Sequence, residues 1–435
     1  MSQQPRQNTS ANGQRRAPRV NDLGLLWTAT TVSSLGTSAT TVILPLIAVS
    51  TLHASVFNVG VLAALGTSAW LLFGLPSGVW VDKVSRRSLL VVCDLARAAA
   101  LASIPVAYAL HVLTLIQLFL VAFAVGTASV FFGVAAQSFI PQVVEANRLL
   151  TANSRLQSSR TVATIAGPAI GGWLVQLLRA PAALMLDVSS YLISASCLSR
   201  IKGVGHGQPM AVKASMVQQV RQGVAYVWRS QTLRPLALMA ASFNLWSTAI
   251  GALQIPFLVR TIHVEPGYAG MLMAIEAPGA LLGSMLVGRL NGRFGNARTI
   301  AISVVAGPLA ALLIPLTTRG AGIILFALGA AVLALFTVVS SIVTRVYRQA
   351  TVAPELISRV TAVNRFISWG VMPIGGLLAG SLSTVVGIRA ALLCLAIGMA
   401  VLTPLAFFAS PLRGTRDLGP AEPAQSPQRA GSKTY

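Results

Sequence analysis

The sequence predicts an all-α polytopic membrane protein, in which twelve transmembrane helices form two pseudo-symmetric six-helix bundles. Of its 435 residues, 54% are hydrophobic and only 10% are charged, and the mean hydropathy is +0.73. Soluble domains carry about 25% charged residues. The apolar residues gather in runs of roughly 20, the helix length that crosses a hydrocarbon core about 30 Å thick.

Six apolar runs precede a polar stretch, and six follow it. The first six are expected at about 22–50, 57–80, 88–110, 113–140, 156–178 and 182–200. The second six are expected at about 235–259, 267–288, 298–317, 321–345, 359–384 and 388–410. This division assigns residues 22–200 to an amino-terminal bundle and residues 235–410 to a carboxy-terminal bundle.

The remaining segments are polar. Residues 1–21 are basic and have no apolar core of a signal peptide, so we expect a disordered cytoplasmic tail. Residues 411–435 are rich in Pro, Gly, Ala and Ser and predict a second disordered cytoplasmic tail. The linker 201–234 includes Met216–Trp228, whose apolar residues follow helical spacing. This amphipathic helix is either a lipid-sensing element on the inner leaflet or a plain connection between the halves.

The distribution of charge predicts the orientation. The net charge is +22, yet with the amino terminus inside only Arg179, Arg260, Arg319 and Arg389 fall in outer loops. Basic loops stay on the cytoplasmic side, so we expect both termini in the cytoplasm of a bacterial plasma membrane. The basic residues form neither a patch nor a reading helix, and no nucleic-acid partner is expected.

A charged loop joins the second and third runs. Its pattern is Gly78-x-x-x-Asp82-Lys83-x-x-Arg86-Arg87. This pattern resembles the loop between helices 2 and 3 of the major facilitator superfamily, with Trp80 in place of a Leu and Ser85 in place of a Gly. The resemblance implies a cytoplasmic gate, in which Asp82 and Arg86 or Arg87 contact the start of helix 11 near Arg359 and Arg365.

The two halves look duplicated. A shift of 210 residues places Gly78 on Gly288 and Glu145 on Glu355. Parallel six-helix repeats related by an axis along the membrane normal are typical of transporters.

The fifth run contains Gly167-Pro168-Ala169-Ile170-Gly171-Gly172. This segment resembles the helix-5 antiporter motif of facilitator-superfamily exporters, and it favours export. Pro168 kinks a helix, and the glycines allow a neighbouring helix to approach closely, so tight packing explains the motif equally well. With the pair Asp94 and Arg97, the segment 140–173 resembles the branch of bacterial enterobactin exporters and macrolide efflux proteins.

Four charged residues inside the runs are candidates for proton coupling, because charges within a membrane are expensive. Asp94 and Arg97 are three residues apart and can pair on one helix face, either as a structural brace or as part of a proton path. Asp187 could snorkel, cap its helix or bind Arg179. Glu276 lies near the middle of the eighth run, where it could carry a proton, face a cationic substrate or bond to a neighbouring helix as a neutral carboxyl.

Polar stripes on the first, seventh and tenth runs are candidates for the substrate cavity, which the resemblance places between helices 1, 4, 7 and 10. They comprise Ser34, Thr37, Thr41, Asn244, Thr248, Gln254, Thr337 and Ser341. Hydrogen bonds between helices are the alternative use of these side chains. Ala122 stands four residues before Gly126, where exporters of the superfamily often have an Arg associated with proton transfer.

The predicted function is secondary active transport: a proton-coupled exporter, or antiporter, of a small hydrophobic or amphipathic molecule such as a drug, antibiotic or siderophore, working by alternating access. The alternative is a proton-independent facilitator or importer of a small metabolite. No nucleotide-binding or hydrolytic motif occurs, so we do not expect an enzyme. We expect no cofactor or metal, since Cys, His, Asp and Glu show no ligand spacing. The expected partners are substrate, protons and lipid; a monomer is the simplest state, and the oligomeric state is open.

Overall fold

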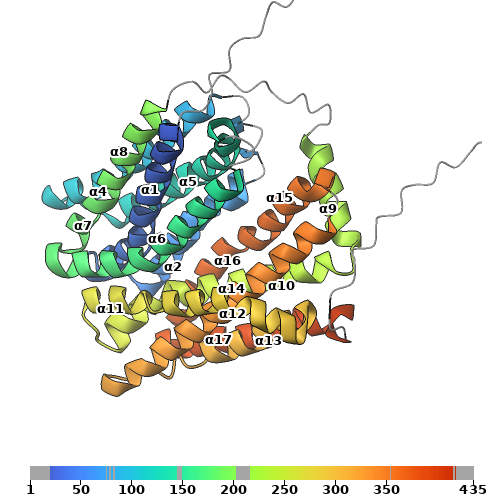
Figure 1. Cartoon of the computed structure of the whole chain (residues 1–435). Coiled ribbons are helices and arrows are strands. Elements are labelled where there is room, and N and C mark those ends of the chain that lie inside the picture. Colours follow the sequence, from blue (N-terminus) through green and yellow to red (C-terminus); the bar gives the residue numbers. More distant parts are fainter. Residues whose placement is uncertain are drawn as a thin grey trace, which may run out of the picture.

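The computed structural model describes residues 20–74, 76–77, 80–81, 84–144, 149–201, 216–352, 354–414 and 417. This part of the chain is helical, without a strand, and it forms two groups of helices (Figure 1). The gate residues Gly78, Asp82 and Lys83 lie outside the described residues. So do both predicted tails, except for the few tail residues that fall within these ranges.

One bundle comprises α1 (Val20–Leu46), α2 (Val56–Phe73), α4 (Arg86–Ala109), α5 (Leu115–Val143), α6 (Leu149–Leu178), α7 (Ala180–Ala183) and α8 (Met185–Arg200). The other comprises α10 (Leu233–Pro256), α11 (Pro266–Met273), α12 (Glu276–Phe294), α13 (Asn296–Ala311), α14 (Ile323–Thr351), α15 (Pro354–Gly370), α16 (Met372–Val386) and α17 (Ile388–Phe408). The linker contributes α9 (Met216–Arg229) between them.

Within the described chain, eleven helical stretches are long and apolar enough to cross a membrane. The predicted ninth span is the exception, because α13 has 16 residues and continues as single turns from Leu312 to Leu316. The all-α fold of two six-helix bundles is confirmed. Two spans expected to be continuous are interrupted: α11 gives way to α12 after Ala274 and Ile275, and α15 to α16 at Val371.

A paired irregularity shows the duplication. Residues Ile47–Thr51 and Phe257–Thr261 each form a π-helical turn, and the two turns are 210 residues apart. Each is followed by a histidine with positive φ, His53 at 48° and His263 at 62°. Such a φ is uncommon for a residue other than Gly. Its recurrence at the same shift shows that both halves leave the first helix by the same turn.

The halves meet along a seam of glycines. α2 packs on α16, where a Cβ atom added to Gly60 would lie 2.5 Å from the carbonyl oxygen of Gly376. α6 packs on α11, where a Cβ atom on Gly172 would lie 2.7 Å from the carbonyl carbon of Gly270. These distances are shorter than any side chain tolerates, so the helices touch through their backbones.

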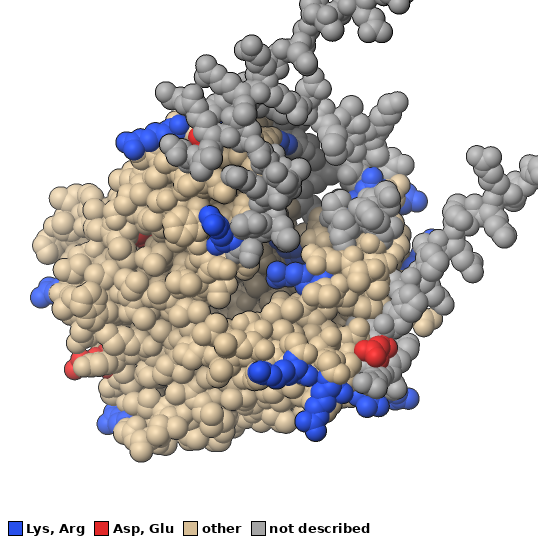
Figure 2. All heavy atoms as spheres, viewed as in Figure 1, with Lys and Arg blue, Asp and Glu red and all other residues tan. Residues whose placement is uncertain are grey.

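Polar contacts join the halves at the same end of the molecule. The guanidinium of Arg260 donates to the carbonyl oxygen of Ala54, and Gln176 Nε2 donates to Glu265 Oε2 at 3.0 Å. All four residues lie at the ends of the helices farthest from the linker. A hollow remains between the two halves elsewhere, and Figure 2 shows it from outside.

The seam predicts an unusual response to alanine. Replacing a glycine inside a helix by alanine normally stabilises by about 1 kcal/mol. Gly60→Ala should instead lower the melting temperature of the purified protein in detergent, because its Cβ would meet the backbone of Gly376 and Gly380.

Gly133→Ala is the matched control, since nothing lies within 4 Å of a Cβ atom there. It should leave the melting temperature unchanged or raise it. Equal shifts for the two variants would contradict the backbone contact at the seam.

Candidate functional site

A buried ion pair lies in the amino-terminal bundle. The guanidinium of Arg97 contacts Asp94 Oδ1 on the same face of α4, as their spacing predicts. The carboxyl of Asp94 is fully buried and Arg97 is 3% exposed. The guanidinium also lies over the rings of Phe132 on α5 and Tyr191 on α8, at 4.3 and 4.2 Å from the ring centroids. Arg97 is therefore held by three helices.

Asp187 extends this group of buried polar residues to α1. Its Oδ2 accepts from Thr40 Oγ1 at 2.5 Å, and its Oδ1 accepts from Ser190 Oγ at 2.9 Å. The side chain is fully buried, so it neither snorkels to the membrane surface nor reaches Arg179, two options that the sequence left open. The reason is Gly36: a Cβ atom there would lie 2.2 Å from Asp187 Oδ1, so only Gly lets α1 and α8 approach.

Asp187 also lies near enough to Arg97 for their charges to attract each other. Tyr191 completes the connection, because its hydroxyl and Thr37 Oγ1 are 2.9 Å apart. We call Asp94, Arg97, Asp187 and Tyr191 the amino-terminal network. Thr37, a candidate for the substrate cavity, thus makes a bond between helices, which was the alternative use of the polar stripes.

The carboxy-terminal bundle places Glu276 at a break in a helix. Before it the backbone tightens, since Ala274 N donates to Met271 O at 3.0 Å and Ile275 N to Leu272 O at 3.1 Å. Glu276 then begins α12. Gln254 of α10, which is 3% exposed, donates from Nε2 to Glu276 Oε1 at 3.4 Å. The structure thus joins a predicted proton-coupling residue to a predicted cavity residue, from two different helices.

Three of the remaining polar stripe residues make hydrogen bonds within their own helices. Ser34, Thr41 and Thr337 donate to backbone oxygens of their own helices, at 2.6, 2.7 and 2.6 Å. A hydroxyl bonded in this way tolerates an apolar environment, so the stripes alone do not require a water-filled cavity. Asn244 and Thr248 on α10 are half-buried, and Ser341 on α14 is exposed.

Of the gate residues, Arg87 has partners in the described structure that differ from the start of helix 11. Arg87 donates from Nε to Leu198 O at 3.2 Å and from Nη2 to Ser199 O, at the carboxyl end of α8. Free carbonyls at a helix end attract a cation, which explains the different partner. Arg359 donates to Gln222 Oε1 of α9 at 2.7 Å. Arg86 begins α4.

The helix-5 motif serves two interfaces. Cβ atoms on Gly167 and Gly171 would lie 2.4 Å from Ser38 Cβ and 2.9 Å from Ala39 O, both on α1. Gly172 belongs to the seam with the other half. Pro168 lies inside α6 between these contacts. The motif therefore packs α6 within its own bundle and against α11 at once.

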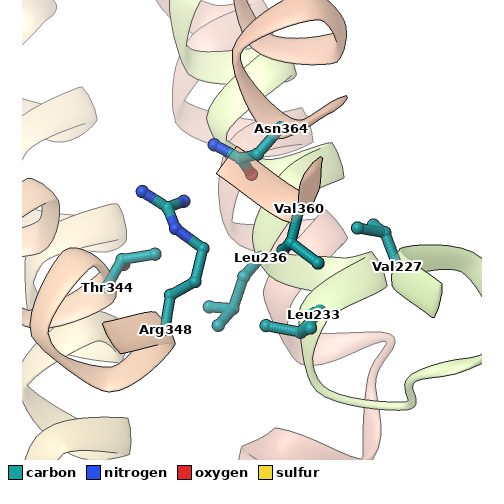
Figure 3. A pocket seen from close by; sticks show the side chains of 7 residues that line it. All are labelled: Val227, Leu233, Leu236, Thr344, Arg348, Val360 and Asn364. Atoms are coloured by element: carbon teal, nitrogen blue, oxygen red, sulfur yellow. The ribbon is translucent and has the colours of Figure 1, made fainter. Parts of the chain in front are cut away.

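A small pocket lies between α9, α10, α14 and α15 (Figure 3). Val227, Leu233, Leu236, Thr344, Arg348, Val360 and Asn364 line it. Its free volume of about 10 Å³ has room for about one water molecule. A drug-sized molecule cannot enter this pocket.

Sequence reasoning missed a group of arginines at the carboxyl end of α14. Arg345 and Arg348 lie on the last turns of α14, which continues to Thr351 rather than ending near 345. They extend the polar stripe of Thr337 and Ser341 at helical spacing, and this continuation was the available signal.

The duplicated bundles, the seam between them and the buried charges in each half define a membrane transporter of the major facilitator superfamily. The family model described as transmembrane secretion effector matches residues 17–430, and the chain belongs to this family. The resemblance to the superfamily is thereby confirmed.

Similar proteins include the multidrug efflux pump Tap of Mycolicibacterium fortuitum, 25% identical over 372 residues, with 83% of this chain and 89% of that protein covered. Macrolide efflux protein A of Streptococcus pyogenes is 23% identical over 331 residues, covering 75% of this chain and 80% of that protein.

Solved structures show the same fold. The nucleoside transporter NupG matches with a TM-score of 0.71 at 17% identity, over 91% of this chain and 100% of that one. A bacterial homologue of the lysosomal transporter Spinster, in an inward-facing and unoccupied conformation, matches with a TM-score of 0.70 at 16% identity, over 93% and 100%.

The amino-terminal network predicts non-additive stability changes. Arg97→Gln should lower the stability in detergent by about 3–5 kcal/mol, because it leaves the Asp94 carboxylate buried without its cation. The double variant Asp94→Asn with Arg97→Gln should recover most of the loss. Thermal unfolding of Arg97→Gln, Asp94→Asn and the double variant tests this, and additive losses would argue against a coupled pair.

Proposed function

We propose that the chain is a secondary active exporter, which moves a small hydrophobic or amphipathic molecule out of the bacterial cytoplasm in exchange for protons. The observation that carries the proposal is the contact of Glu276 with Gln254 at the interrupted eighth helix. Interrupted helices near the middle of the membrane form substrate and ion sites in transporters. The names of the efflux relatives support export of a drug or antibiotic; a siderophore belongs to the same range of expected substrates.

Alternating access follows from how the halves touch. The seam at Gly60 and Gly172 and the bond from Arg260 to Ala54 close one end of the hollow. With both termini in the cytoplasm, as the charge distribution predicts, this end faces outward and the structure is open inward. Rocking the bundles about the seam exposes the same hollow to the outside.

Glu276 is the best-placed residue for carrying the proton. Its partner among the described residues is the neutral amide of Gln254, so it takes up a proton without breaking an ion pair. Asp94 differs, because Arg97 compensates its charge. Asp187 differs too, since hydroxyls of Thr40 and Ser190 bind both of its oxygens. In this proposal the amino-terminal network braces its bundle while Glu276 exchanges protons.

A proton-independent facilitator or importer of a small metabolite is the second candidate. The observation in its favour is Ala122, a buried apolar residue on α5 where many proton-coupled exporters have an Arg. This candidate predicts transport that a protonophore does not change when the membrane potential is matched.

Glu276→Gln separates the two candidates. In inside-out vesicles with a proton gradient, a macrolide, a tetracycline and an aromatic cation are added while a pH-sensitive dye reports proton movement. A transported compound should release protons in the wild type, and Glu276→Gln should abolish the release because the amide carries no exchangeable acid proton.

Asp417→Asn is the control, because Asp417 is an exposed carboxylate that accepts from Asn296 N at 3.0 Å far from the hollow. It should behave as the wild type. Proton release that persists in Glu276→Gln would remove Glu276 from the proton path. Accumulation of a labelled compound without any proton signal would favour the facilitator.

A further inference from the structure

Four arginines from both halves lie close to one another. Arg160 lies on α6 of the first bundle, Arg345 and Arg348 lie on α14, and Arg365 lies on α15. Arg345 is close enough to Arg348 and to Arg365 for their positive charges to repel, and Arg160 is close enough to repel Arg365. The group therefore bridges the two bundles. We call these four residues the arginine cluster.

Aromatic rings adjoin the cluster. The guanidinium of Arg365 lies 5.0 Å from the ring centroid of Trp369 and 5.7 Å from that of Trp70. The two rings touch edge to face at 4.4 Å, and they come from different halves. A cation over a ring is attracted to its face, so the tryptophans hold Arg365 in place. They also present apolar surface next to its charge.

The charge of the cluster is not compensated by the carboxylates whose side chains the structure describes. Asp94 and Asp187 belong to the amino-terminal network, and Glu276 is bonded to Gln254. The Nε atom of Arg348 is buried without a hydrogen-bond partner in the described structure. Figure 2 shows blue side chains around the hollow, while the red ones visible in this view lie elsewhere.

The positive charges of the arginine cluster repel one another strongly, because the cluster is partly desolvated. A bound anion would offset this repulsion and stabilise the cluster. Guanidinium groups match carboxylates and phosphates with paired hydrogen bonds. A cationic drug would meet repulsion at the same place. The unpaired Nε donor of Arg348, the positive charges and the neighbouring rings therefore fit one kind of ligand.

We propose that the arginine cluster binds the anionic group of the transported substrate, and that the substrate class is an amphipathic organic anion with an aromatic or apolar body. A carboxylate or phosphate would lie among Arg160, Arg345, Arg348 and Arg365, and the body would contact Trp70 and Trp369. This inference rests on the proposed transport function. The same anion chemistry is found in a lipid headgroup, and the experiments below separate the two.

Binding is tested first, by titration calorimetry on the full chain in a neutral detergent. The probes are 4-phenylbutyrate, its amide and 4-phenylbutylammonium, which share one body and differ in charge. Phenylbutyrate should bind at least tenfold more tightly than the amide, and the ammonium should not bind. Equal affinities, or tighter binding of the ammonium, would overturn the proposal.

Arg348→Gln and Arg365→Gln should each weaken phenylbutyrate binding about tenfold, because each removes a charged donor. Arg413→Gln, at an exposed arginine near the carboxyl end, should bind as the wild type does. The melting temperature without ligand gives a second reading. Arg348→Gln should keep or raise it, since repulsion falls; a marked decrease would show an arginine held by an internal counter-ion, which overturns the proposal.

Reconstitution separates substrate from lipid. Proteoliposomes of phosphatidylcholine, with and without phosphatidylglycerol, are assayed for counterflow of labelled phenylbutyrate. A substrate site is supported if counterflow falls about tenfold in Arg365→Gln and does not change when phosphatidylglycerol is present. If phosphatidylglycerol abolishes phenylbutyrate binding and no counterflow is seen, the cluster binds a lipid headgroup. That result overturns the substrate class.

The outcomes distinguish failure of the anion site from failure of the proposed transport function. If the vesicles export a macrolide or an aromatic cation while phenylbutyrate does not bind, transport stands and the anion site does not. If phenylbutyrate binds through the arginine cluster but no compound is transported, the anion site stands while its link to a substrate and the proposed function both fail.

Discussion

The cost of placing a charge in hydrocarbon governs how this chain uses its few charged side chains. Asp94 is paired with Arg97, and Asp187 is bonded to two hydroxyls, so both carboxyls are compensated inside their bundle. Arg87 is bonded to carbonyls at the end of α8. Against this background the uncompensated groups are informative. Among the described residues, the hydrogen-bond partner of Glu276 is the neutral amide of Gln254, and the arginines of the cluster repel one another.

The glycine seam supplies the complementary property, a contact that two bundles can make and break. Interlocking side chains hold two helices in one geometry. Helices that touch through the backbones of Gly60 and Gly172 have few side chains to separate when the bundles move apart. The polar bonds at the closed end are few: Arg260 to Ala54 and Gln176 to Glu265. The matching π-helical turns lie next to this end, so the duplicated irregularity is located where the halves meet. Each half is thus held together by its own buried contacts, while the two halves are joined by backbone contacts and a small number of polar bonds.

Sequence reasoning succeeded where one helix is enough to decide the outcome. Span positions follow from hydrophobic length, and the pairing of Asp94 with Arg97 follows from their spacing on α4. It missed the break before Glu276, although Pro278 is a signal for it, because a proline has no N–H for the carbonyl of Ala274 four residues earlier and its ring clashes with that oxygen. It could not decide where the partner lies on another helix. For Thr37 a cavity role and a bond between helices both stayed open, and the structure gives the bond, to Tyr191 of α8. Likewise the arginine cluster combines residues from α6, α14 and α15, which only tertiary structure brings together.

Glu276 and the arginine cluster, taken together, have an energetic consequence. If one proton enters through Glu276 for each monovalent anion that leaves from the cluster, both movements carry positive charge inward. Two elementary charges then cross the membrane per cycle, and the potential contributes about 4.6 kcal/mol per 100 mV. Exchange of one proton for a monovalent cation would move no net charge and draw only on the pH difference. A carboxyl and a cationic cluster that both lack a counter-charge among the described residues therefore suit export driven by the membrane potential as well as by the proton gradient.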